Sequence, residues 1–308
     1  MGMTHGYDRE NPTDETQCVK VIRQAIDSGV TLIDTADVYG PFTNEDLVGR
    51  ALTDGYRERA VLATKVGLVI PDDPTGLGKS TTAPGIYNQA RPEHIRKAID
   101  DSLRRLRTDY VDLYQLHRVD PLVPLEETWG AMAEAVQAGK ARFLGLSEVS
   151  VEQIKQADLI HPVSTVQSEM TLWTRDVMDA VLPYCEANGI ALLPFAPLGR
   201  GFFAGRFTSR DELPRDDVRR RLPRFQQSAI EANLDLARRV KSVADRLDAA
   251  PGQVALAWVV AQGKRVVPIP GTKTPRYLAE NAHAAEVVLA PDDLAELDAL
   301  PTAVGDRY

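Results

Sequence analysis

The sequence contains few cysteines, no long apolar run and no excess of basic residues. Its two cysteines, Cys18 and Cys185, are too few for a disulfide framework and fit a reducing cytoplasm. The apolar runs are shorter than the roughly 18 residues of a membrane span, and the N-terminus does not resemble a signal peptide. The 36 basic and 44 acidic residues give a net charge of −8, whereas nucleic-acid binders usually carry a basic patch. We therefore expect a cytoplasmic protein that binds neither membranes nor nucleic acid.

Short apolar segments rich in β-branched residues alternate with longer segments of helical period. Ile95, Ile99, Leu103 and Leu106 show this period, and Asp14 with Gly29 gives start and stop signals for the first expected helix. Alternation along the whole chain predicts a parallel sheet with helices outside it, in one domain over residues 1–308. We expect seven strands, at residues 30–33, 61–63, 111–114, 143–146, 163–166, 190–193 and 266–269.

The fold class follows from what stands at the ends of these segments. Six of them in succession end in a residue that can react or bind, and in a (β/α)8 (TIM) barrel such residues gather at the carboxyl ends of the strands. Two long irregular stretches, residues 71–90 and 199–224, follow strands on the same side, as binding loops do. We therefore predict an α/β fold of the (β/α)8 class with one strand missing; the residues at the strand ends are Asp34, Lys65, His117, Ser147, Gln167 and Phe195.

Three residues at these positions and a tyrosine in the first loop form a group that suits delivery of a proton. Tyr39 follows Asp34 in the loop after its strand, and a phenol with a pKa of about 10 is a weak acid at neutral pH. An ammonium group such as that of Lys65 favours the phenolate, and Asp34 would keep this ammonium charged. A neutral His117 could align a carbonyl group. Together they suit protonation of a ketone or aldehyde oxygen.

The sequence resembles the aldo-keto reductases, and in particular their microbial branch, over nearly its whole length. The motifs that carry the resemblance occur in the family's order, at residues 29–40, 115–121, 144–147, 166–169, 194–201 and 269–273. The resemblance implies a catalytic tetrad of Asp34, Tyr39, Lys65 and His117.

The resemblance also implies NADPH as the cofactor, bound across the mouth of the barrel. Ser147 and Gln167 would hold the nicotinamide carboxamide, and Phe195 would stack on the ring; Glu148 stands where the family usually has asparagine. Leu198, Gly199 and Arg200 would line the pyrophosphate. The adenosine end would be held by Gly271, Thr272, Lys273, Arg276, Glu280 and Asn281, with the two cations on the 2′-phosphate.

The leading hypothesis is an NADPH-dependent reductase of small aldehydes or ketones, without a metal, acting as a monomer or weak homo-oligomer. One alternative is a cofactor-binding regulatory protein with slow or no turnover, like the potassium-channel β subunits. Another is a barrel aldolase in which Lys65 forms a Schiff base, which borohydride trapping would reveal.

The start of the chain gives one further expectation. Relatives of this kind begin with a short hairpin and a first barrel strand that ends in a Gly-x-Met-Gly-Met segment, whereas this sequence begins at Met1-Gly2-Met3. We expect that the numbered chain starts at an internal methionine and that the natural protein is longer at its N-terminus.

Overall fold

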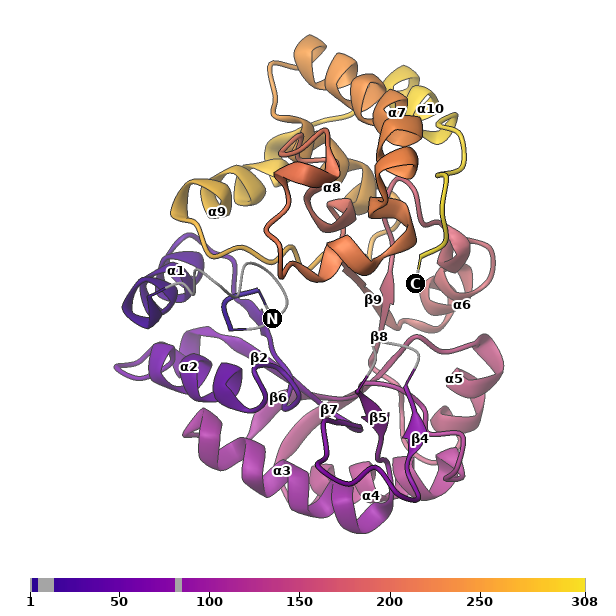
Figure 1. The fold of residues 1–308 in the computed structure, drawn as a ribbon. Coiled ribbons are helices and arrows are strands. Elements are labelled where there is room, and N and C mark those ends of the chain that lie inside the picture. Colours follow the sequence, from indigo (N-terminus) through magenta and orange to yellow (C-terminus); the bar gives the residue numbers. More distant parts are fainter. Residues whose placement is uncertain (1, 5–13, 81–84, 308) are drawn as a thin grey trace.

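The computed structural model describes residues 2–4, 14–80 and 85–307. Its centre is a curled parallel sheet with helices around its outer face (Figure 1). The six strands of the sheet are paired in sequence order, each with the next. They are β1 (Leu32–Asp34), β2 (Val61–Val66), β6 (Val111–Leu116), β7 (Ala141–Ser147), β8 (Thr165–Glu169) and β9 (Ala191–Phe195).

The helices begin and end where the local sequence predicts. Asp14 caps the first helix by accepting hydrogen bonds from the backbone N–H groups of Thr16 and Gln17, and Gly189 ends another in the left-handed conformation. The periodic apolar residues from Ile95 to Leu106 are buried, as expected. The helices are α1 (Glu15–Asp27), α2 (Thr43–Ala51), α3 (Pro92–Leu106), α4 (Leu125–Gln137), α5 (Val151–Asp158), α6 (Val181–Asn188), α7 (Gln227–Arg246), α8 (Pro251–Ala261), α9 (Pro275–Ala282) and α10 (Pro291–Asp298).

The side chains of each strand alternate between an outer face, which the helices cover, and an inner face toward the barrel axis. On the inner face Leu32, Ala63, Leu113 and Leu193 form an apolar cluster. Because side chains two residues apart on a strand share a face, the residues two positions further along these strands also face inward. Those residues are Asp34, Lys65, Gln115 and Phe195, so the strand order aims reactive side chains at one end of the barrel.

The predicted strand at residues 266–269 is wrong as a strand of the sheet. This segment runs parallel to β9 and makes a single bridge, between Val266 and Leu192, with three backbone hydrogen bonds around it. The N–H groups of Val267 and Ile269 donate to β9, but Pro194 in β9 has no backbone N–H to donate in return, so the ladder is interrupted there. The sheet therefore has six strands, followed by an extended segment where a seventh was expected.

The two long stretches expected to be irregular are partly ordered. Near the first, β3 (Leu68–Val69), β5 (Tyr87–Asn88) and β4 (Gly78–Lys79) form a small antiparallel sheet. The second consists of short 3-10 turns, and aromatic side chains anchor it: Trp173 stacks on Phe202 and meets Phe203 edge-on. Both stretches follow strands of the central sheet, which places them around the mouth of the barrel.

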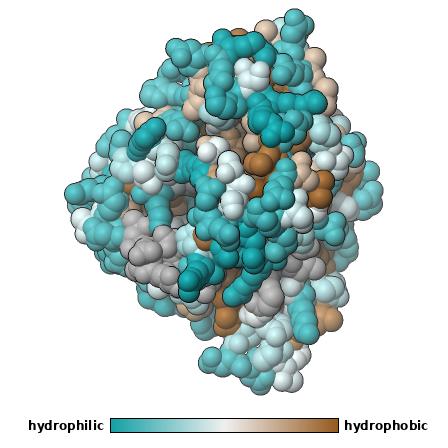
Figure 2. Space-filling view, turned by 45° about the horizontal axis from the view of Figure 1, so that its top comes forward, coloured by the Kyte–Doolittle hydropathy of each residue, from teal (hydrophilic) through white to brown (hydrophobic). Residues whose placement is uncertain are grey.

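Within the described residues, no strand pairs with the outer edge of β1. The expected start of the natural chain upstream of Met1 stays a prediction. Figure 2 shows a face on which hydrophilic residues predominate and hydrophobic ones appear in small separate areas. Among the described helices, none is both long enough and apolar enough to cross a membrane.

Candidate active site

The fold brings the predicted tetrad together around the ammonium group of Lys65. Lys65 Nζ donates to Asp34 Oδ1 at 2.5 Å, to the Thr35 carbonyl at 2.8 Å and to the Tyr39 hydroxyl at 3.2 Å. The lysine side chain is fully buried, whereas Asp34 remains 10% exposed. An ammonium removed from water needs such partners, and three acceptors match its three N–H bonds.

His117 completes the group from the next strand. It follows β6 directly, and its backbone N–H donates to the Val66 carbonyl at 2.8 Å, which fixes the position of the residue. Its imidazole meets the Tyr39 ring edge-on, with ring centroids 5.8 Å apart. The Nδ1 atom is buried and has no hydrogen-bond partner among the described residues. The structure thus places an imidazole and a phenol side by side, each from a different strand end.

The environment sets the protonation states of these groups. Burial lowers the pKa of Lys65, but the Asp34 carboxylate and Tyr39 raise it by more, so its pKa lies above the usual value and the ammonium stays charged. Burial, together with Lys65 and Arg118, holds the pKa of His117 well below its usual value, so the imidazole is neutral. For Tyr39 burial outweighs the neighbouring ammonium and raises the phenol pKa. The phenol is therefore protonated at neutral pH, which a proton donor requires.

Two glutamines hold the other oxygen of Asp34, and the sequence analysis identified only one of them. Gln115 and Gln167 each donate an amide N–H to Asp34 Oδ2 at 3.0 Å, and Gln167 also donates to Gln115 Oε1 at 3.1 Å. The signal for Gln115 was available: it interrupts an apolar strand two residues before His117. With Nε2 of Gln167 engaged, its carbonyl oxygen is the atom left to accept from a cofactor amide.

The remaining residues predicted for the nicotinamide end lie along the same rim. Ser147 ends β7, is buried, and its hydroxyl accepts from Arg118 at 3.0 Å. Phe195 ends β9, and Glu169 pairs with it from the neighbouring strand. Glu148, in the position after Ser147, has a left-handed backbone conformation and accepts a hydrogen bond from the Glu169 backbone N–H at 2.9 Å.

The residues predicted for the phosphate and adenosine ends meet around Gly252 in α8. A Cβ atom on this glycine would lie 3.3 Å from Glu280 Oε1 and 3.6 Å from Leu198 Cδ2. Gly199 also needs to be glycine: its φ is +56°, and a Cβ would lie 2.9 Å from the Phe203 ring. The Arg200 guanidinium lies 3.8 Å from Glu169.

The adenosine end also contains an unused acceptor. The buried Oδ1 atom of Asn281 has no hydrogen-bond partner in the described part of the chain. A buried acceptor of this kind is costly without a donor, and the exocyclic amine of an adenine is a suitable one. Lys273 is half-buried and Arg276 is exposed, and both lie on the segment 271–281. This donor and acceptor set fits a phosphorylated dinucleotide.

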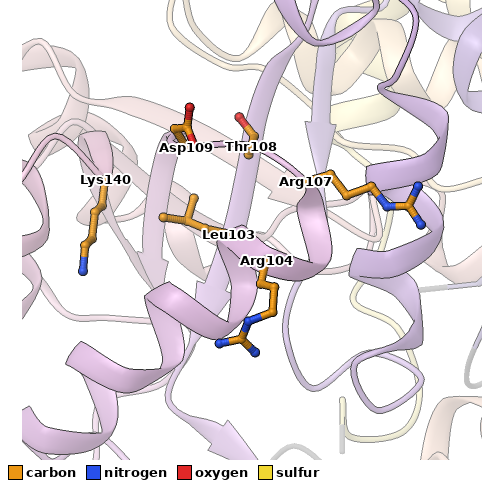
Figure 3. Close-up of a pocket in the computed structure, with 6 residues that line it drawn as sticks. All are labelled: Leu103, Arg104, Arg107, Thr108, Asp109 and Lys140. Atoms are coloured by element: carbon orange, nitrogen blue, oxygen red, sulfur yellow. The ribbon is translucent and has the colours of Figure 1, made fainter.

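Metal-binding groups and surface depressions elsewhere in the structure could also mark a site. In the described ranges there is no group of three or more His, Cys, Asp or Glu residues that could hold a metal ion. A shallow depression of about 400 Å³ lies between the end of α3 and the segments that lead into β6 and β7. Figure 3 shows the residues that line it. Because Asp109 and Lys140 precede those strands, the depression lies at the amino ends of the strands, opposite the tetrad. It takes no part in the site.

The chain belongs to the aldo/keto reductase family, whose model matches residues 1–301. A probable aldo-keto reductase from soybean, Glycine max, is 40% identical over an alignment of 311 residues that covers 100% of this chain and 86% of the relative. The structure of a glycerol dehydrogenase from Gluconobacter oxydans is similar with a TM-score of 0.83 and 31% identity, covering 94% of this chain and 86% of that one. An aldo-keto reductase from Klebsiella pneumoniae, solved in complex with NADPH, gives a TM-score of 0.69 and 30% identity over 92% and 84% of the two chains.

These findings confirm the predicted family and barrel class. The protein is an oxidoreductase of the aldo/keto reductase family.

The depressed pKa of His117 predicts a pH-dependent stability. As the pH falls below about 6.5 the unfolded chain binds a proton at this histidine and the folded protein does not, so the folded state loses stability toward acid. The contribution is at most about 1.4 kcal/mol per pH unit for one group. We expect His117→Gln to remove it, so that urea denaturation between about pH 5 and pH 8 gives a shallower dependence than in the wild type.

A matched control is His283→Gln, which replaces an exposed histidine and should keep the wild-type dependence. Identical pH dependences for the wild type and His117→Gln would mean that the imidazole takes up its proton in the folded protein.

Proposed function

We propose that this protein reduces aldehydes or ketones to alcohols with NADPH, and that residues 1–308 form the one catalytic domain. The observation that carries the proposal is the chain of contacts from the Tyr39 hydroxyl through the buried Lys65 Nζ to Asp34 at the mouth of the barrel. Two relatives from Klebsiella pneumoniae support the cofactor, because their structures contain NADPH and NADP respectively.

The cofactor would lie across the strand ends. Gln167 and Ser147 would hold the carboxamide and Phe195 the ring, while Leu198, Gly199 and Arg200 would line the pyrophosphate. When bound, NADPH supplies a hydride to the carbonyl carbon of the substrate. The adenosine end would be held by Gly271, Thr272, Lys273, Arg276, Glu280 and Asn281.

Tyr39 would supply the proton. As the carbonyl oxygen gains negative charge, the phenol O–H donates its proton to it and becomes a phenolate. The Lys65 ammonium, 3.2 Å from the phenol oxygen, stabilises that phenolate, and Asp34 keeps the ammonium charged and in place. The neutral imidazole of His117, beside the Tyr39 ring, orients the carbonyl by hydrogen bonding. The proton returns to Tyr39 from solvent after the alcohol leaves.

Removing the phenol hydroxyl tests the proton donor. We expect Tyr39→Phe to lower turnover by about 10²–10⁴-fold, the usual contribution of a general acid, while leaving NADPH binding nearly unchanged. NADPH oxidation with a panel of aldehydes and ketones measures turnover, and quenching of protein fluorescence measures binding.

Tyr114→Phe is the matched control, since Tyr114 is a buried tyrosine on the outer face of β6 whose hydroxyl lies 3.5 Å from the Ile95 carbonyl. It should keep wild-type turnover. A Tyr39→Phe enzyme with more than about a tenth of the wild-type rate would refute the assignment of the donor. A wild-type protein that binds NADPH tightly but reduces no carbonyl compound would favour the alternative of a cofactor-binding regulatory protein.

The phosphate-binding role of Lys273 and Arg276 gives a separate prediction. The 2′-phosphate is present in NADPH and absent from NADH, so replacing both cations by methionine should weaken NADPH binding and leave NADH binding little changed. Charge-assisted contacts contribute about 1.5–3 kcal/mol each, so we expect a loss of tenfold or more in NADPH affinity.

The control pair is Arg238→Met with Lys241→Met on the exposed side of α7, which carries none of the predicted site residues. An equal loss of affinity for both cofactors in the Lys273 and Arg276 variant would show that these cations do not recognise the 2′-phosphate.

A further inference from the structure

The C-terminal tail places a guanidinium group at the nicotinamide end of the proposed cofactor site. Arg307 Nη2 lies 2.6 Å from Glu148 Oε2, and Arg307 Nε donates to Glu169 Oε2 at 2.8 Å. The same guanidinium lies 5.4 Å from the centroid of the Phe195 ring. Figure 1 shows the C-terminal segment running from α10 down to the ends of β8 and β9. Nothing in the local sequence around Arg307 indicates this placement.

The two carboxylates belong to the inner rim of the barrel. Gln167 reaches Asp34 at the barrel axis, and Glu169, two residues further along β8, shares its face. Glu169 also accepts from the Thr174 hydroxyl at 3.0 Å, and its side chain is only 4% exposed. Glu148 is tied to it through the Glu169 backbone N–H. Glu169 therefore stands beside Phe195, its partner on β9, and Glu148 joins it through the Arg307 guanidinium.

The tail that carries Arg307 is held at two earlier points. Asn233 makes two hydrogen bonds with the backbone of Val304, at 2.8 and 3.0 Å. Arg224 Nε donates to the Gly305 carbonyl at 3.1 Å, and the same arginine donates to the Thr174 hydroxyl. The tail is thus bound to the long loop, to α7 and to the rim, and Arg307 is a built part of the site.

Arg307 is the cation that pairs with both carboxylates, Glu148 and Glu169. Arg200 lies 3.8 Å from Glu169, and Arg224 and Asp306 are also close enough to interact electrostatically with this cluster. The nicotinamide ring of NADP⁺ carries a positive charge and the dihydronicotinamide of NADPH carries none. The charges beside Phe195 therefore change the binding free energy of NADP⁺ more than that of NADPH. If the two carboxylates lost their positive partner, they would attract the charged ring and favour NADP⁺.

We propose that Arg307 determines the relative affinity of the site for reduced and oxidised cofactor, by neutralising Glu148 and Glu169 so that NADPH is favoured. This inference rests on the proposed function. It assigns to a tail residue the control of how reduced and oxidised cofactor compete for the site, because the ratio of the two affinities sets the reduction potential of the bound cofactor.

The test is the ratio of the dissociation constants of NADP⁺ and NADPH, measured by fluorescence titration and by calorimetry. Arg307→Met keeps the packing on Phe195 and removes the positive charge, so NADP⁺ should gain about tenfold on NADPH. Glu148→Gln keeps the acceptor for the Glu169 N–H and removes a negative charge, so the ratio should move in the opposite direction by a similar factor. The double variant has the same net charge at this place as the wild type and should return close to the wild-type ratio.

Two controls separate charge from packing. Arg307→Lys keeps the positive charge and should keep the wild-type ratio. Arg175→Met removes another arginine that holds the C-terminal part of the chain, through the carbonyls of Leu297 and Asp298, and should also leave the ratio unchanged.

If Arg307 only supported the fold or obstructed the site, Arg307→Met would change both dissociation constants by the same factor. An unchanged ratio of the two constants in both Arg307→Met and Glu148→Gln would overturn the proposal. The Glu148→Gln measurement decides alone if Arg307→Met fails to fold. A wild type that binds neither NADP⁺ nor NADPH would instead refute the proposed function.

Discussion

The buried ammonium group of Lys65 is the constraint on which the site depends. A charge removed from water on the inside of a barrel is tolerated only with partners of opposite charge or polarity, and Lys65 has the Asp34 carboxylate, the Thr35 carbonyl and the Tyr39 hydroxyl. Two of these come from the end of β1 and one from its loop. The requirement to satisfy one lysine therefore holds Tyr39, the proposed proton donor, at the mouth of the barrel.

The same constraint extends across the sheet. The second oxygen of Asp34 is held by Gln115 from β6 and Gln167 from β8. Together with Lys65, these side chains form a polar layer next to the apolar cluster of Ala63, Leu113 and Leu193. The apolar layer closes the interior and the polar layer organises the chemistry. On the rim above, Arg307 from the tail pairs with both Glu148 and Glu169 and forms a second group of charges.

Much of this arrangement was predictable because it depends on local position. Asp34, Lys65 and His117 each stand where a strand gives way to its loop, and parallel strands bring their carboxyl ends together whatever lies between them. Helix ends were predictable for the same reason, since caps such as Asp14 act within one turn.

The features that the sequence did not predict depend on contacts between segments far apart in the chain. The segment at residues 266–269 has the composition of a strand, but the pairing that would make it one is interrupted by Pro194 on the neighbouring strand. The partners of Arg307 lie more than a hundred residues away, and no periodicity or motif near the C-terminus points to them. The direction of the Tyr39 pKa shift could not be predicted from the sequence either, because it depends on how far burial outweighs the Lys65 ammonium.

The most direct test of the central role of Lys65 compares Lys65→Met with the double variant Asp34→Asn, Lys65→Met. The single change leaves the Asp34 carboxylate without its counter-ion and should cost about 3–5 kcal/mol in the free energy of unfolding. The double change removes both charges and should recover most of that stability, yet the enzyme should remain without measurable carbonyl reduction because the phenolate of Tyr39 has lost its ammonium. A double variant that is as stable as the wild type and still reduces carbonyl compounds would contradict the account.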